Sequence, residues 1–215
     1  EMTQIRVGVA SAFLLLSIKP IYERDFKRFL FFAFLGFSFH YSALLIFPLW
    51  FLDNKPKKTW LFWTIPIGYS MFFLGINFIG VIPIPGIQEK IELYKNFQEL
   101  GYAESEVVNI FSVIFLIRVC VFYLIIWKYE LIVQNNKFTP ILIKIYSLGL
   151  VSYLVFASMP VFAIRISELF FVVEILLIPF LIYIFRPLLF GKIIILSLSV
   201  FVFFIFIFHT KLIIN

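Results

Sequence analysis

The chain has 215 residues, of which 63% are hydrophobic and only 14% are charged. Soluble domains carry roughly 45–50% apolar and about 25% charged residues, and a chain of this size leaves about 30% of its surface in solvent. The composition therefore excludes a water-soluble fold and predicts a lipid environment. The net charge of +6 does not indicate nucleic acid, because the Lys and Arg residues cluster in short gaps between apolar runs. A single cysteine, Cys120, excludes an intrachain disulfide framework.

Long apolar runs dominate the sequence, and each is bounded by charge, Pro or Gly. A membrane-spanning helix needs about 20 mostly apolar residues, and the runs lack the polar/apolar alternation of spanning strands. The sequence predicts an all-α, polytopic transmembrane bundle of six or seven segments, forming a single integral membrane domain over residues 1–215. The runs are Ile5–Ile18, Phe29–Leu52, Trp60–Ile82, Val107–Trp127, Pro140–Ala163, Glu168–Phe185 and Ile193–Phe208.

The second run, Phe29–Leu52, has two interpretations. The gaps Lys19–Arg28 and Asp53–Thr59 on either side are both basic, and the positive-inside rule places both in the cytoplasm. A single span between them would put one gap on each side. The run is therefore either a plain span with one basic loop outside, or a broken, re-entrant hairpin that bends near Gly36–His40.

The longest gap, Pro83–Glu106, is acidic and predicts an extracytoplasmic loop. Within it Ile87, Ile91, Tyr94 and Phe97 recur at helical spacing, which predicts a short amphipathic helix on the membrane surface. This helix is either a structural connector or a functional lid. Because the chain opens inside an apolar segment, we also expect it to be a fragment that lacks its N-terminal part.

The polar residues inside the apolar runs are the main functional candidates. A charge near the bilayer centre costs about 2.5–3.5 kcal/mol on insertion scales, so such residues are rarely kept without a use. They are Arg6, His40, Arg118, Arg165 and Glu174.

Each of these residues also has a purely structural interpretation. Arg118 and Glu174 could pair with one another and lock the bundle, and Arg165 could pair with Glu168 one turn away at a helix end. His40 could be a satisfied interior histidine. Lys144 is expected to extend toward a membrane boundary.

Considered together, the arginines favour an anionic ligand. Three unpaired arginines in the bilayer would cost roughly 8–10 kcal/mol, and the runs hold too few carboxylates to neutralise them all. The guanidinium fork matches phosphate oxygens, so a lipid-linked diphosphate suits both the charge and the environment. The sequence shows no nucleotide-binding loop, HExxH motif or serine nucleophile elbow, nor an Asp-rich metal site, so we expect cofactor-free, metal-independent chemistry.

The chain resembles the EpsG-type branch of the Wzy polysaccharide polymerases. The resemblance rests on Gln4-Ile5-Arg6 followed by Ala10, on Phe39-His40-Tyr41-Ser42-Ala43-Leu44, on Tyr94 in the long loop, and on the late Arg165. It implies a glycosyltransferase that polymerises undecaprenyl-diphosphate-linked oligosaccharide repeat units into O-antigen, capsule or exopolysaccharide. Such an enzyme acts at the outer face of the bacterial inner membrane, and a chain-length regulator protein is a candidate partner.

The resemblance and the charge pattern together nominate a site. We expect Arg6 and Arg165 to hold the diphosphate, and His40 to act as the base or to orient one. Glu89 or Glu92 of the long loop are competing candidates for the base. Further candidates for substrate binding are Arg118, Ser42, Tyr94, Glu168 and Glu174.

Two other functions compete with the polymerase. A transporter or flippase of lipid-linked sugars would also need intramembrane arginines, although no internal repeat of the kind common in transporters is visible. A non-catalytic membrane scaffold would tolerate neutral residues at positions 6, 40 and 165.

Overall fold

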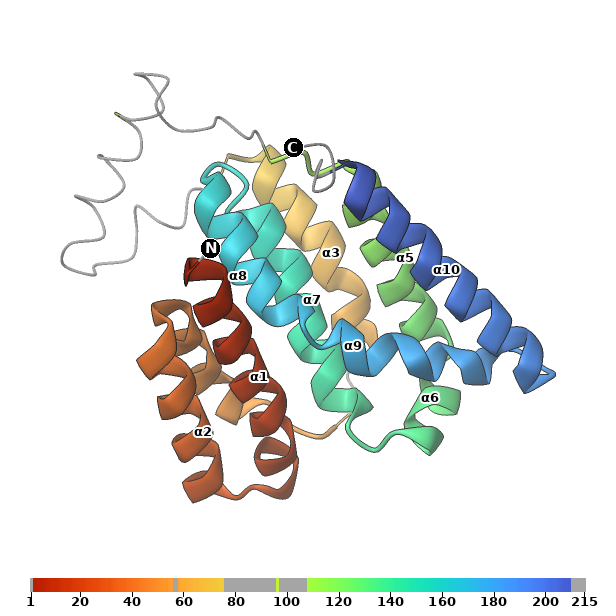
Figure 1. The fold of residues 1–215 in the computed structure, drawn as a ribbon, viewed down its shortest axis with the longest axis horizontal. Helices are drawn as coiled ribbons and strands as arrows, with labels where there is room; N and C mark the ends of the chain where they lie inside the picture. Colours follow the sequence, from red (N-terminus) through yellow and green to blue (C-terminus); the bar gives the residue numbers. More distant parts are fainter. Residues whose placement is uncertain (1, 56–57, 76–95, 97–107, 210–215) are drawn as a thin grey trace.

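The computed structural model describes residues 2–55, 58–75, 96 and 108–209, and all regular structure in these ranges is helical (Figure 1). This confirms the predicted all-α class for the described part of the chain. The principal helices are α1 (Met2–Glu23), α2 (Phe26–Phe39), η1 (Tyr41–Phe51), α3 (Lys58–Phe73), α5 (Val113–Trp127), α6 (Tyr129–Asn135), α7 (Thr139–Val155), α8 (Pro160–Phe171), α9 (Glu174–Leu177), η3 (Ile178–Ile184) and α10 (Leu188–His209).

Within the described residues one helical segment, Ile5–Glu23, is long and apolar enough to cross a membrane. The central apolar helices are shorter: α5 has 15 residues and α7 has 17, so at about 1.5 Å per residue they fall short of a hydrocarbon core about 30 Å thick. The structure thus gives helices where the sequence predicts apolar runs, and it does not establish the predicted number of spans.

The run Phe29–Leu52 is broken at His40, within the stretch where the sequence predicts a bend. α2 ends at Phe39, His40 is extended with φ −151° and ψ 131°, and η1 begins at Tyr41. α2 and η1 pack against each other and form what we call the α2–η1 hairpin. Gly36 permits this closeness, because a Cβ there would lie 3.3 Å from Ile46 Cδ1 and 3.3 Å from Phe13 Cβ of α1.

Because the chain turns back at His40, the two basic gaps lie at one end of the molecule, here called the basic end. Arg24, between α1 and α2, donates to the carbonyl oxygens of Trp50 (2.8 Å) and Leu52 (2.6 Å). The Asn54 amide donates to the Tyr22 carbonyl at 3.0 Å. A hairpin with both ends on one side is the geometry that a re-entrant segment requires.

The opposite end, called the His40 end, collects the turn at His40, the start of α1 and the turn between α7 and α8 (Figure 1). The residues that flank the predicted long loop also lie near this end: Tyr153, close to the turn between α7 and α8, donates its hydroxyl to the Asn109 carbonyl at 3.5 Å, and Tyr69 of α3 donates to the Ile110 carbonyl at 3.2 Å. Apart from Asn96, the segment Pro83–Glu106 that holds the predicted surface helix lies outside the described residues.

Helix α7 forms the centre of the bundle and is buried along most of its length. It packs against α3, α5 and α8. Gly149 allows α8 to approach, because a Cβ there would lie 2.9 Å from the Phe171 ring and 3.2 Å from Phe170 Cβ. The position of α8 is therefore set by close contact with a buried helix.

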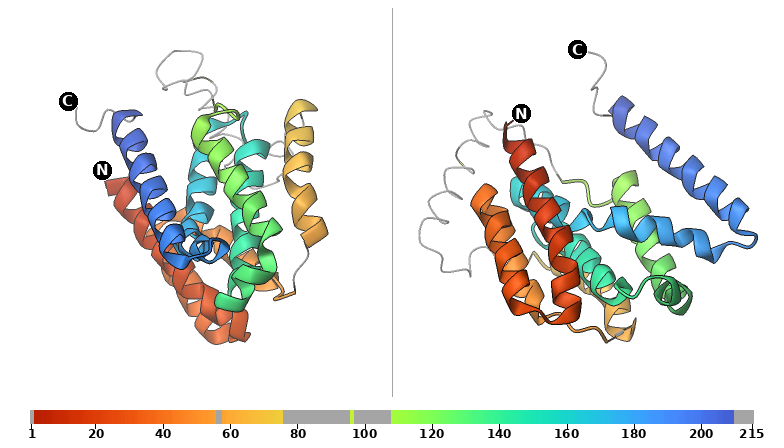
Figure 2. Two further views of the ribbon diagram at one scale, coloured as in Figure 1. Left: turned by 90° about the vertical axis from the view of Figure 1, so that its right-hand side faces the viewer. Right: turned by 60° about the horizontal axis from the view of Figure 1, so that its bottom comes forward.

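The structure corrects two predicted boundaries in the C-terminal half. Arg165 does not lie at a break, because Pro160 starts α8 and the helix runs through Arg165 to Phe171. The run Glu168–Phe185 is not one helix but the end of α8 followed by α9 and η3. α10 then packs on η3 and stands apart from the α1–α2 pair (Figure 2).

Candidate functional site

Three packed elements bring Arg6, His40 and Arg165 near one another at the His40 end. Arg6 lies on α1, Arg165 on α8, and His40 in the turn of the α2–η1 hairpin. α8 packs against both α1 and η1, and the charges of Arg165 and Arg6 both act on the His40 imidazole. The three residues that the sequence nominates thus gather in space although they are far apart along the chain.

Neither Arg6 nor Arg165 forms an ion pair or side-chain hydrogen bond with another described residue, and both are exposed. Arg28 differs, since its Nε lies 3.2 Å from Asp25 Oδ2. Arg24 also differs, because its guanidinium binds two backbone carbonyls. Two guanidinium groups at the His40 end therefore keep their donors available for an external anion.

His40 is half-buried and is held by the backbone of its own turn. Its amide donates to the Gly36 carbonyl at 3.1 Å, which ends α2. Its Nδ1 accepts from the Ser42 backbone N–H at 3.1 Å, which starts η1, and Ser42 Oγ also lies 3.1 Å from Nδ1. His40 and Ser42 thus form one capping unit that fixes the ring.

Arg118 and Glu174 form the ion pair that the sequence analysis gives as their structural interpretation. Arg118 Nε donates to Glu174 Oε1 at 2.9 Å and Nη2 donates to Oε2 at 3.3 Å. The guanidinium carbon lies 4.0 Å from the centre of the Phe171 ring. The Arg118 guanidinium is thus already bound by the Glu174 carboxylate and stacked on the Phe171 ring. Arg118 and Glu174 are therefore better placed to join α5 to α9 than to bind substrate.

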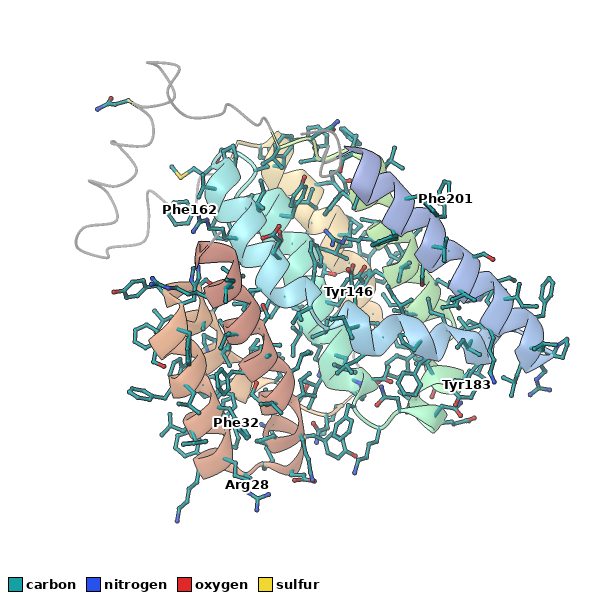
Figure 3. The ribbon with its side chains drawn as sticks, in the orientation of Figure 1. Arg28, Phe32, Tyr146, Phe162, Tyr183 and Phe201 are labelled. Atoms are coloured by element: carbon teal, nitrogen blue, oxygen red, sulfur yellow. The ribbon has the colours of Figure 1, made fainter. Side chains whose placement is uncertain are left out.

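Tyr146 completes this pair and was not nominated from the sequence. Its hydroxyl lies 2.9 Å from Glu174 Oε1 and donates there, and it also lies 3.2 Å from the Arg118 carbonyl. Tyr146 sits on buried α7 near the middle of the molecule (Figure 3). Nothing in an apolar run marks one tyrosine as the partner of a distant ion pair, so sequence reasoning could not single it out.

Glu168 lies one turn after Arg165 on α8, and its charge interacts with both Arg118 and Arg165. Arg165 and Glu168 do not form the predicted helix-end ion pair, since no ion pair within 4.0 Å joins them among the described residues. Tyr94, Glu89 and Glu92 lie outside the described residues. The part of the chain that the structure describes holds no group of three or more His, Cys, Asp or Glu side chains placed to bind a metal ion.

Lys144 corrects another expectation. It lies near the basic end, but its ammonium does not reach solvent, because its side chain is only 6% exposed. Its Nζ donates to the carbonyl oxygens of Asp53 (2.6 Å) and Lys55 (2.9 Å) and pairs with the Asp53 carboxylate. Lys144 thereby fastens the end of the hairpin to the central helix.

The pair Arg118–Glu174 gives a first prediction. Glu174→Met leaves a partly buried guanidinium without its carboxylate and is expected to cost about 3 kcal/mol of folding stability. The double variant Arg118→Met/Glu174→Met removes both charges and is expected to cost less than either single change. Thermal unfolding of the purified proteins in detergent measures this; a double variant as unstable as the sum of the singles contradicts it.

The apolar composition and the candidate span indicate an α-helical membrane protein. The chain belongs to the EpsG family, whose sequence model matches residues 1–214, and this confirms the resemblance seen in the sequence. It is also similar to the amylovoran biosynthesis protein AmsC of Erwinia amylovora, with 25% identity over 187 residues, covering 84% of this chain and 48% of that protein. The chain therefore spans about half the length of this relative. No solved structure matches it.

Proposed function

We propose that the protein polymerises lipid-diphosphate-linked oligosaccharide repeat units at the outer face of a bacterial inner membrane. Membership of the EpsG family supports a role in polysaccharide biosynthesis, and the similarity to a protein of amylovoran biosynthesis agrees with it. The observation that carries the proposal is the gathering of Arg6, Arg165 and His40 from three separate elements.

The charges at this site suit a diphosphate ligand. Arg6 and Arg165 have no ionic partner among the described residues, so the site carries uncompensated positive charge. Such charge is costly near a membrane and is offset when an anion binds. A diphosphate supplies the negative charge, and its isoprenoid tail stays in the lipid beside the exposed apolar side chains of the helices.

The reaction needs the site mainly to stabilise a leaving group. A hydroxyl of one repeat unit attacks the anomeric carbon of the growing glycan, and the bond from that carbon to the phosphate oxygen breaks. The electron pair remains on the diphosphate, where two guanidinium groups can stabilise it. The hydroxyl proton leaves, and the products are the lengthened glycan and the free lipid diphosphate.

The two ends of the molecule fit the proposed orientation. The basic end carries Lys and Arg residues of both basic gaps, as cytoplasmic loops do. The His40 end carries the candidate site together with residues that flank the acidic segment, such as Asn109, which accepts from Tyr153 close to the turn between α7 and α8. With the basic end in the cytoplasm, Arg6, His40 and Arg165 lie toward the outer face, where repeat units are polymerised.

The proposal is tested in a deletion strain complemented with the full-length gene carrying Arg6→Ala, His40→Ala or Arg165→Ala. Surface polysaccharide is separated on a gel, and protein abundance is followed by immunoblot. We expect each variant at normal abundance to collapse the long ladder to a single-repeat band.

Other outcomes separate the competing functions. Loss of all repeat units from the surface would support a transporter instead. A normal ladder from all three variants would indicate that these residues are structural, and the polymerase site proposed here would be wrong.

A further inference from the structure

The ring of His40 is held by the backbone N–H group of Ser42, which can donate a hydrogen bond but cannot accept one. Nδ1 accepts from the Ser42 backbone N–H at 3.1 Å, and a backbone amide has no lone pair to offer in return. Nδ1 must therefore be unprotonated while this bond exists. A neutral imidazole has one N–H group, so the proton resides on Nε2.

The charges around the ring favour this neutral form. Partial burial of the ring is the largest factor that opposes its protonation, and the positive charges of Arg165 and Arg6 oppose it further. Protonation at Nδ1 would also turn two donors, the ring N–H and the Ser42 amide, toward each other. A hydrogen bond lost in this way leaves a half-buried donor unsatisfied.

We propose that His40 is a neutral Nε2–H donor to the phosphate oxygens of the lipid diphosphate, and that Ser42 fixes this tautomer. The inference rests on the polymerase function proposed above, and it differs from the sequence-based expectation that His40 is the base. To act as a base at Nε2 the ring would have to carry its proton on Nδ1, which the Ser42 amide opposes. Arg6, Arg165 and His40 then each donate N–H hydrogen bonds to the same diphosphate.

In the reaction the Nε2–H group donates to the diphosphate as the bond between its oxygen and the anomeric carbon breaks. His40 neither gains nor loses a proton. The proton of the attacking hydroxyl ends on the departing diphosphate or in water.

Two variants of similar size separate a donor from a base. His40→Gln places an amide N–H near the position of Nε2 but cannot take up a proton. His40→Asn offers an acceptor near the position of Nδ1, which can keep the Ser42 amide bonded, but it does not reach the Nε2 position. We expect the glutamine variant to polymerise at least about tenfold faster than the asparagine variant, the worth of one hydrogen bond to a charged group.

The assay is the surface ladder together with turnover of purified lipid-linked repeat units at matched protein abundance. A glutamine variant as inactive as His40→Ala overturns the donor role. An asparagine variant with wild-type turnover overturns it as well, because Nε2 would then have no function.

A spectroscopic measurement tests the tautomer without relying on activity. Nitrogen-15 NMR of the ring-labelled full-length protein at neutral pH, minus the spectrum of His40→Gln, isolates the two ring nitrogens of His40. We expect one protonated nitrogen, assigned to Nε2, and one unprotonated nitrogen, assigned to Nδ1. An imidazolium or an Nδ1–H tautomer overturns the inference, whereas a normal ladder from Arg6→Ala and Arg165→Ala overturns the proposed function and leaves the tautomer standing.

Discussion

Replacing Arg6 and Arg165 together by glutamine is expected to lower kcat/KM for polymerisation by about 10³-fold. Removing one preorganised donor from a developing charge typically costs about 10²–10³-fold in rate, and both guanidinium groups are proposed to face one diphosphate. Because they act on the same ligand, the two single losses are not expected to multiply. The measurement is turnover of purified lipid-linked repeat units by protein in detergent or in vesicles.

Controls for this prediction come from the same chain. Arg28→Gln removes a guanidinium from the basic end, where Arg28 points away from the bundle (Figure 3) and pairs with Asp25, so its kcat/KM is expected to stay within about twofold of wild type. Arg165→Lys keeps the charge but loses the fork and is expected to recover only part of the activity. If both single glutamine variants retain nearly full kcat/KM, the arginines do not contact the leaving group.

The candidate site could be nominated from the sequence only because charges are rare in apolar runs. Arg6 and Arg165 stand out for that reason, and the motif around His40 added the family resemblance. Their gathering could not be deduced, because it depends on how α8 packs against α1 and the α2–η1 hairpin. Close contacts such as that of Gly149 with Phe171 fix this packing, and nothing in the spacing of the residues encodes it.

The ends of the helices are also only partly predictable from the sequence. The bend near His40 is one of the two interpretations that the sequence allows, and it is the one that keeps both basic gaps in the cytoplasm. The boundary predicted near Arg165 is wrong, because Pro160 favours the first turn of a helix and this helix continues through Arg165. In a chain this apolar, hydrophobicity marks helices well but marks their ends poorly.

Lys144 shows why a buried charge can be misjudged from sequence. A lysine near the end of an apolar run usually extends to the membrane surface, and that was the expectation. Its acceptors, Asp53 and Lys55, precede it by some 90 residues, with separations of 91 and 89. Only the folded hairpin brings them to α7.

This contact leads to the largest expected effect on stability. Lys144→Met retains the length and apolar stem of the side chain but removes the ammonium from two carbonyls and the Asp53 carboxylate. Breaking a buried ion pair on one side typically costs about 3–5 kcal/mol, and the side chain of Lys144 is only 6% exposed. We expect a clearly lower thermal unfolding midpoint and reduced abundance in the membrane, both followed by size-exclusion chromatography of heated detergent extracts.

The matched control is Lys19→Met, which removes a lysine that is 65% exposed on its side chain and only distantly paired with Glu23 at 3.9 Å. Its unfolding midpoint is expected to match wild type. Asp53→Asn combined with Lys144→Met should recover part of the loss, because it removes the charge that the lysine balances. An unchanged midpoint for Lys144→Met alone would contradict the proposed fastening of the hairpin to α7.

The variant Lys144→Met also separates effects on folding from effects on catalysis. Lys144 lies at the basic end, whereas His40 lies at the other end of the hairpin that Lys144 holds. Lys144→Met should therefore reduce the amount of folded enzyme while the molecules that remain folded keep most of their turnover. The double glutamine variant of Arg6 and Arg165 should do the reverse, with normal abundance and almost no polymer. If Lys144→Met instead lowers turnover per folded molecule as strongly, the hairpin transmits strain to His40, and its attachment to α7 is part of the site.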